Sequence, residues 1–222
     1  MRYDTPVQEK FDKYAQILRD WQTRMNLVAP STLDDIQGRH IDDSTQLAGY
    51  VPEDANVIDM GSGAGFPGVV LAILGRNVVC IESIGKKARF LEELKKQLNL
   101  PNLTIVNDRV ENYLATKRKT ENLVFTARAF APLIKILDYI WIYKKRMNKE
   151  SGAEVSVSAY LLKGANINKE IIAARWKYKF NYELSPSKTG DGFIVAIKNI
   201  RKKTGDRITG PRPPLRSLRE LE

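Results

Sequence analysis

The first fifty residues carry the hydrophobic pattern of amphipathic helices. Apolar side chains recur at steps of three and four over residues 7–27, the spacing that places them on one helix face. This stripe consists of Val7, Phe11, Tyr14, Leu18, Trp21 and Met25. A short helix is expected to follow, and residues 39–48 predict a further one that ends near Gly49. We therefore expect a helical extension over residues 1–52.

From residue 56 the pattern changes to short apolar runs that alternate with helical spacing. The expected strands are 56–60, 78–82, 103–107, 123–127, 156–162, 178–184 and 193–200. The expected helices are 67–75, 86–99, 110–116, 131–146 and 166–175. Such alternation is typical of an α/β fold, in which a mostly parallel sheet of seven strands carries helices on both faces.

The end of the chain departs from this alternation. Residues 190–192 read Gly-Asp-Gly and predict a hairpin-like return, which makes the final strand antiparallel. Residues 147–154 are expected to form a polar loop. We expect the α/β domain to span 53–200 and a basic, Pro-rich tail over 201–222 to be disordered in isolation.

Composition narrows the class of protein. The 222 residues are 43% apolar, which is normal for one domain with its own core. A single cysteine, Cys80, excludes a disulfide framework and a Cys-based zinc site, and we expect no metal. The sequence shows neither a signal-peptide pattern nor an apolar run long enough to span a bilayer. We expect a cytoplasmic monomer without membrane contacts.

Charge indicates an anionic partner. The net charge is +10, and residues 198–222 hold 8 Lys/Arg against 3 Asp/Glu, which accounts for +5 of it. Nucleic acid is the first candidate for a partner of such a chain. The alternative is a solvated surface with a charged tail.

The turn after the first expected strand carries the densest chemical signal. Residues 56–68 read Asn-Val-Ile-Asp-Met-Gly-Ser-Gly-Ala-Gly-Phe-Pro-Gly, with glycines that let the backbone turn tightly against a ligand. Gly63-x-Gly65-x-x-Gly68 matches the dinucleotide fingerprint. However, Asp59 lies two residues before the first glycine, which resembles the turn of class I S-adenosylmethionine (SAM) methyltransferases. SAM has an ammonium group and no phosphate, so Asp59 and Gly63 are candidate SAM-binding residues.

Residues after the next strands refine this interpretation. Glu82 ends the second strand, where a carboxylate would accept hydrogen bonds from ribose hydroxyls; the alternative is an ordinary strand-end acid. Residues 107–111 follow the third strand, where this class contacts adenine. Cys80 is interpreted as a buried core residue, which argues against C5-pyrimidine chemistry. Residues 127–132 lack the Asn/Asp-Pro-Pro-aromatic turn of enzymes that methylate exocyclic amines.

A set of motifs occurs in a familiar order along residues 11–200. The set comprises Trp21, Met25-Asn26-Leu27, Arg39-His40-Ile41-Asp42-Asp43-Ser44, Asp59–Gly68, Ser83–Leu91, Arg109-Val110-Glu111, Ala127-Arg128-Ala129-Phe130-Ala131 and Leu162-Lys163-Gly164. Together these motifs closely resemble the bacterial family of small-subunit rRNA guanine-N7 methyltransferases called RsmG or GidB. The resemblance implies a class I SAM-dependent methyltransferase (Rossmann-like) fold and SAM as cofactor. It also implies methylation of N7 of a guanine in 16S rRNA, as naked rRNA or in the small ribosomal subunit.

The resemblance assigns cofactor contacts to individual positions. Gly61 and Phe66 in the turn would contact SAM, as would Val110 and Glu111 after the third strand. Arg128, after the fourth strand, would contact it as well.

The reaction itself predicts what the site needs. Guanine N7 already carries a lone pair, so no catalytic base is expected and positioning for in-line transfer should suffice. Arg109 and Arg128 are expected to hold guanine O6 or a nearby phosphate, since the planar fork of arginine suits either target. The alternative for both is a surface salt bridge.

Four further residues are candidates for substrate contacts. Lys86 and Arg89 begin a helix beside the site, and Lys163 ends the fifth strand. His40, the single histidine, either contacts substrate or cofactor or makes a structural hydrogen bond between the helical extension and the core. Two rival functions stay open at this point: an NAD(P)-dependent oxidoreductase, and an RNA-binding protein that keeps the fold without catalysis.

Overall fold

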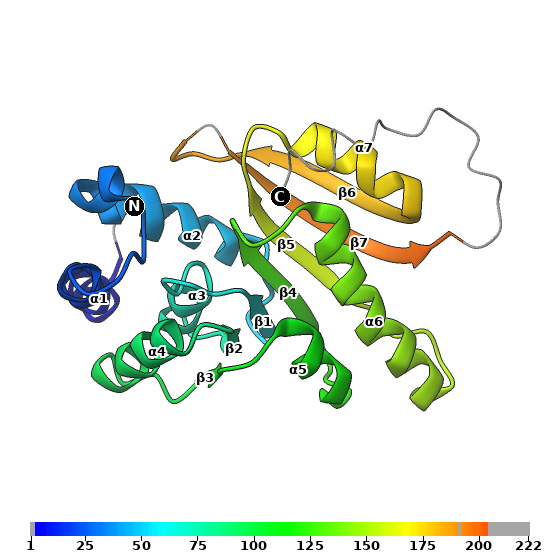
Figure 1. The fold of residues 1–222 in the computed structure, drawn as a ribbon, viewed down its shortest axis with the longest axis horizontal. Helices are drawn as coiled ribbons and strands as arrows, with labels where there is room; N and C mark the ends of the chain where they lie inside the picture. The colour runs from blue at the N-terminus through cyan, green and yellow to red at the C-terminus, as the bar shows by residue number, and fades with distance from the viewer. Residues whose placement is uncertain (1–2, 191, 204–222) are drawn as a thin grey trace.

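A seven-stranded mixed sheet forms the centre of the protein (Figure 1). The computed structural model describes residues 3–190 and 192–203. Along the sheet the strands follow the order β3-β2-β1-β4-β5-β7-β6. The strands are β1 (Asn56–Met60), β2 (Asn77–Ile81), β3 (Leu103–Val106), β4 (Leu123–Arg128), β5 (Ser158–Lys163), β6 (Tyr178–Pro186) and β7 (Phe193–Lys202).

Strand directions confirm the predicted fold class. Strands β1 to β5 pair in parallel, whereas β7 runs antiparallel to both β5 and β6. The reversal of the last strand was predicted from the turn residues before it. As a result, the carboxyl ends of β1 to β5 and the β6–β7 turn lie at one edge of the sheet.

Helices cover both faces of the sheet, as predicted. They are α1 (Thr5–Gln22), α2 (Asp43–Thr45), α3 (Gly68–Ile73), α4 (Gly85–Gln97), α5 (Val110–Thr116), α6 (Leu133–Ser151) and α7 (Ile167–Lys177). Alternate strand residues point to opposite faces, so Val57 joins the core under α1, α3 and α4, whereas Ile58 joins the core under α5, α6 and α7.

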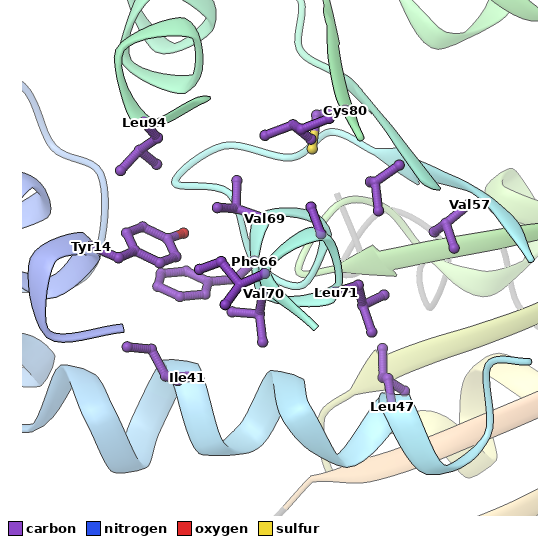
Figure 2. Packing of buried hydrophobic residues seen from close by; sticks show 14 of the residues in the cluster. Tyr14, Ile41, Leu47, Val57, Phe66, Val69, Val70, Leu71, Cys80 and Leu94 are labelled. Carbon is purple, nitrogen blue, oxygen red and sulfur yellow. The ribbon is translucent and has the colours of Figure 1, made fainter. Parts of the chain in front are cut away.

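The N-terminal stripe packs as its spacing predicts. Phe11, Tyr14 and Leu18 of α1 are fully buried against the first core. The expected short helix after α1 is present as a 3-10 turn, η1 (Pro30–Asp35). The predicted helix over 39–48 is present as consecutive turns of different pitch: a π turn η2 (Gln37–Asp42), α2, and a 3-10 turn η3 (Gln46–Gly49). In Figure 2, Ile41 and Leu47 of this segment face Val70 and Leu71 of α3.

The predicted loop over 147–154 and the predicted tail over 201–222 have different outcomes. The predicted loop 147–154 is wrong in its first half, because α6 continues to Ser151 and ends at Gly152, whose φ is 68°. Completely buried Met147 anchors this last turn. Most of the predicted tail, from residue 204 on, lies outside the described residues. The division into 1–52, 53–200 and 201–222 stays a prediction.

Candidate functional site

The glycine turn after β1 presents bare backbone at the carboxyl edge of the sheet. Gly61 and Gly63 have φ angles of 67° and 54°, and the N–H groups of Gly61 and Ser62 both donate to the Ile81 carbonyl at 3.0 Å. A Cβ on Gly63 would meet only the Gly61 carbonyl oxygen, at 3.9 Å. The glycines therefore give a rigid turn whose backbone is open at Gly63.

Asp59 lies beneath this turn and is completely buried. Its Oδ2 accepts the Gly68 N–H at 3.2 Å and its Oδ1 accepts the Thr126 hydroxyl at 3.2 Å. Burial raises the pKa of Asp59 to about 6, although hydrogen bonds from its neighbours act in the opposite direction. In this structure Asp59 holds the turn against α3 and β4; its predicted contact with SAM stays a prediction.

Glu82 connects the turn to the end of β2. Its Oε2 accepts the Gly63 N–H at 2.9 Å and its Oε1 accepts the Ile84 N–H at 2.8 Å. A carboxylate has about four lone-pair sites, so two hydrogen bonds leave capacity for the hydroxyls of a ribose. The position fits the predicted role of Glu82.

A cavity of about 210 Å³ opens beside the turn. Three predicted residues, Arg109, Val110 and Glu111, line it at the start of α5, and Gly61 lines it from the turn. Arg109 is 74% exposed and lies 3.9 Å from Glu111. The remaining lining residues are Ile81, Ser83, Asp108, Phe130 and Tyr139. Below, this space is called the turn cavity.

A larger cleft of about 640 Å³ adjoins the ends of β4 and β5. Its walls come from the π turn, the segment after β4, the segment after β5 and the β6–β7 turn. The lining residues are Arg39, Asp43, Arg128, Ala129, Phe130, Ala131, Pro132, Leu162, Lys163, Gly164, Glu170, Ser187, Thr189, Gly190, Gly192 and Phe193. Two predicted site residues, Arg128 and Lys163, lie here.

Phe130 lines both the cleft and the turn cavity. Its ring packs so closely on Gly61 that a Cβ on this glycine would overlap the ring. Ala129, just before it, has a φ of 49°, which directs the chain sharply away from β4. Sequence reasoning missed Phe130, although it lies within the motif that contains Arg128.

The Arg128 guanidinium is enclosed by polar and aromatic groups. It donates through Nη2 to His40 Nδ1 at 2.7 Å and through Nη1 to the Arg39 carbonyl at 3.3 Å. Its Nη1 also lies 3.5 Å from Asp43 Oδ2, and the group lies 4.8 Å from the centre of the Phe66 ring. Burial lowers the pKa of Arg128, while Asp43 raises it.

His40 and Phe66 are part of the same stack rather than of the cleft lining. The rings of His40 and Tyr14 each stack on Phe66 with centroids 5.0 Å away (Figure 2 shows Tyr14 beside Phe66). His40 Nδ1 accepts from Arg128, so its Nε2 carries the proton and donates to Thr32 Oγ1 at 2.8 Å. Burial and the Arg128 charge lower the pKa of His40 to about 4.

The predicted basic residues divide between different places. Lys163 is mostly buried: its Nζ pairs with Glu170 at 2.6 Å and donates to the Ala131 carbonyl at 2.9 Å. Arg89 lines a separate groove along α4, and exposed Lys86 precedes it on the same helix. The structure therefore brings Lys163 to the cleft and leaves Lys86 and Arg89 outside its lining; their RNA contacts stay predictions.

Polar residues missed in the sequence attach the β6–β7 turn to the N-terminal segment. Asp43 Oδ1 accepts the hydroxyls of Ser187 and Thr189, both at 2.9 Å. Gln46 Oε1 accepts the Lys188 N–H at 2.8 Å. We call this set the clasp. Asp43 belongs to a quoted motif, but no local pattern marks its partners about 145 positions later.

Residues 3–190 and 192–203 contain neither a membrane-spanning helix nor a metal-binding cluster. None of these helices is long and apolar enough to cross a membrane. These residues also contain no group of three or more His, Cys, Asp or Glu side chains placed to hold a metal ion.

Comparisons with known proteins agree on one family. Residues 7–189 match the model of the GidB family, described as rRNA small subunit methyltransferase G. A protein of that name from Hyphomonas neptunium is 36% identical over 201 residues, which covers 88% of this chain and 89% of the relative. Another from Orientia tsutsugamushi (strain Ikeda) is 40% identical over 192 residues, covering 85% and 89%.

Solved structures share the fold at low sequence identity. A SAM-dependent methyltransferase from Aquifex aeolicus aligns with a TM-score of 0.53 at 12% identity, covering 82% of this chain and 97% of that one. A variant of MtNAS in complex with S-adenosylmethionine aligns with a TM-score of 0.54 at 11% identity, and the alignment covers 86% of this chain and 75% of that one.

Proposed function

The chain belongs to the GidB family, rRNA small subunit methyltransferase G, and from this we propose that it methylates N7 of a guanine in 16S rRNA. The methyl donor is SAM. The substrate is 16S rRNA or the small ribosomal subunit, the place of action is the cytoplasm, and one copy of the chain suffices.

The residues around the glycine turn fit SAM. Gly63 leaves open space where a side chain would stand, and Glu82 is fixed by two backbone N–H groups with lone pairs to spare. We assign the cofactor to this turn, with Gly61, Val110 and Glu111 around it. SAM supplies a methyl group activated by its sulfonium.

One observation carries the proposal: Phe130 lines both the turn cavity and the cleft. A donor beside the glycine turn and an acceptor in the cleft would approach each other across this residue. Holding two reactants in line can contribute about 7–11 kcal/mol toward the barrier, so positioning can carry the catalysis.

The titratable groups at the cleft favour N7 over an exocyclic amine. Asp43 pairs with Arg128, Glu170 pairs with Lys163, and the Nδ1 lone pair of His40 accepts from Arg128. Each of these potential bases is therefore engaged by a cation. Guanine N7 needs no deprotonation, whereas an exocyclic amine loses a proton during transfer.

The two predicted catalytic arginines take different places in this proposal. Arg109 is exposed at the mouth of the turn cavity, where it can contact an incoming nucleotide. Arg128 reaches the cleft with most of its donors engaged, so we assign it chiefly to holding the site together. Its predicted hydrogen bond to guanine O6 would use the N–H groups that are not engaged by His40, Asp43 and the Arg39 carbonyl.

The decisive experiment uses 16S rRNA from a strain without this gene. After chemical cleavage specific for N7-methylguanine, primer extension is expected to lose one stop that returns on complementation with the intact gene. An unchanged pattern would overturn the proposed substrate.

Formation of S-adenosylhomocysteine by purified protein with small subunits of the deletion strain distinguishes an enzyme from a non-catalytic RNA-binding protein. Titrations with SAM and with NADH test the oxidoreductase alternative.

A further inference from the structure

Within the described part of the chain, three cationic side chains line the cleft, and two of them are neutralised within the fold. Arg128 lies beside Asp43 and donates to His40, and its side chain is 18% exposed. Lys163 pairs with Glu170 at 2.6 Å and is 9% exposed. Neither presents an uncompensated charge to a ligand.

Arg39 differs from both. It is exposed on the cleft wall, and over residues 3–190 and 192–203 its guanidinium has no ion pair or hydrogen bond. Its Nη1 lies 3.5 Å from the place where a Cβ on Gly190 would be, so the β6–β7 turn passes close beside it. Among the residues that the structure describes, the cleft therefore keeps one cation, Arg39, for a ligand from outside the chain.

The backbone at Arg39 is held firmly in place. Arg39 belongs to the π turn η2, and such turns occur frequently at functional sites. Its carbonyl accepts from Arg128, and the next residue, His40, accepts from Arg128 as well. The buried arginine thus fixes the segment that carries the exposed one.

We propose that Arg39 binds a phosphate of the RNA strand beside the methylated guanine. The inference rests on the proposed function, because it assumes that an RNA strand enters the cleft. The planar fork of arginine forms paired, charge-assisted hydrogen bonds with phosphate. Arg39 is the substrate-contacting arginine of the cleft, and Arg128 is a positioning residue behind it.

The test compares Arg39→Gln with wild type on small subunits from the deletion strain. Loss of a charge-assisted contact should raise KM for the subunit about tenfold or more, with kcat and the Kd for SAM unchanged. Loss of one phosphate contact should also reduce the slope of log binding constant against log salt concentration by about 0.7–0.9. Arg39→Lys, which keeps the charge, should retain the wild-type slope and lose only part of the affinity.

The matched control is Arg118→Gln. Arg118 is exposed in the segment before β4, at the amino edge of the sheet and away from the cleft, and its loss should change neither KM nor the salt slope. The proposal is overturned if Arg39→Gln keeps the wild-type salt slope and KM, or if it loses SAM binding, since that result assigns Arg39 to the fold. If the wild-type enzyme failed to methylate the small subunits, the proposed function would be refuted. The salt dependence of subunit binding, compared between wild type and Arg39→Gln, would still decide the role of Arg39.

Discussion

The charge of Arg128 dictates the protonation of its neighbours. A largely buried guanidinium is stable only with a carboxylate beside it, which Asp43 provides at 3.5 Å. His40 lies 2.7 Å away and must accept a hydrogen bond, so it must be neutral. A proton on Nδ1 would remove that acceptor and bring a second positive charge against Arg128.

The pKa of His40 should therefore be measurably low. The folded value is about 4 against an ordinary 6.5, so the folded state resists a proton that the unfolded state takes up. Stability from this group is fully present above pH 6.5 and is lost as the pH falls toward 4, by up to about 3 kcal/mol. Because His40 is the only histidine, an NMR titration of untagged protein reads its pKa directly.

A comparison with His40→Gln isolates this contribution from that of Asp59. The raised pKa of Asp59 acts in the opposite sense, since it lowers stability as the pH rises from 3.8 to about 6. The difference in free energy of unfolding between wild type and His40→Gln cancels the Asp59 effect. We expect this difference to shrink as the pH falls from 7 to 4; a constant difference would contradict the assigned protonation state.

At the scale of elements, the clasp joins parts of the chain that the sequence separates widely. Asp43 uses Oδ2 for Arg128 at the end of β4 and Oδ1 for the β6–β7 turn. Three of the elements that line the cleft therefore meet on one carboxylate. The position of the β6–β7 turn depends on these hydrogen bonds because its own residues are mostly polar and incompletely buried.

Removing both hydroxyls of the clasp should loosen this wall. Each lost hydrogen bond contributes about 0.5–1.5 kcal/mol, so Ser187→Ala with Thr189→Ala should lower the free energy of unfolding by about 1–3 kcal/mol. Amide hydrogen exchange at Lys188 should accelerate, and KM for the RNA substrate should rise. Thr104→Ala, an exposed change on β3, is the control. Unchanged exchange in the double variant would show that other contacts position the turn.

Elements with a local signal were predictable from the sequence, and contacts between distant side chains were not. The alternating runs predicted all seven strands, because a short apolar run between turn residues is itself the local sign of a buried strand. The end of α6 was misplaced because polar residues 148–151 look like a loop, whereas buried Met147 packs the last turn and the helix ends only at Ser151, before the left-handed Gly152.

The candidate site divides in the same way. Glu82 and Val110 follow strand ends, and their places near the glycine turn could be predicted from that rule alone. The sequence also indicated Arg128, but not that His40 and Asp43 would take up its donors. Asp43 and His40 are 85 and 88 positions away from Arg128 in the sequence. Their contacts with Arg128 depend on how the sheet packs against the N-terminal segment, and no local sequence pattern encodes that packing.

At the scale of the whole molecule, Cys80 reports on global opening. Its side chain is fully buried in β2, and this burial raises the pKa of the thiol well above the ordinary range. A thiol reagent should therefore modify it only when the sheet opens. As the single cysteine, it gives one unambiguous signal.

Cofactor binding should slow the labelling of Cys80. A ligand at 100 times its Kd stabilises the folded state by about 2.7 kcal/mol, which corresponds to about 100-fold slower labelling by global opening. The measurement is the rate of thiol modification with and without SAM. A second, exposed thiol from Thr104→Cys should react at once under both conditions. Labelling of Cys80 at the same rate with saturating SAM would mean that the thiol is reached through a local opening.

The antiparallel direction of β7 determines where the chain leaves the sheet. Phe193 pairs with Lys163 at the carboxyl edge, and Lys202 pairs with Tyr178 at the opposite edge. Strand β7 therefore ends at the edge of the sheet opposite the cleft (Figure 1), and Lys203, the last residue described, donates its N–H to the Lys177 carbonyl there. A linker to a sensor chip or an affinity resin attached directly to Lys203 starts at the edge opposite the cleft and leaves the cleft accessible, even to a particle as bulky as a ribosomal subunit.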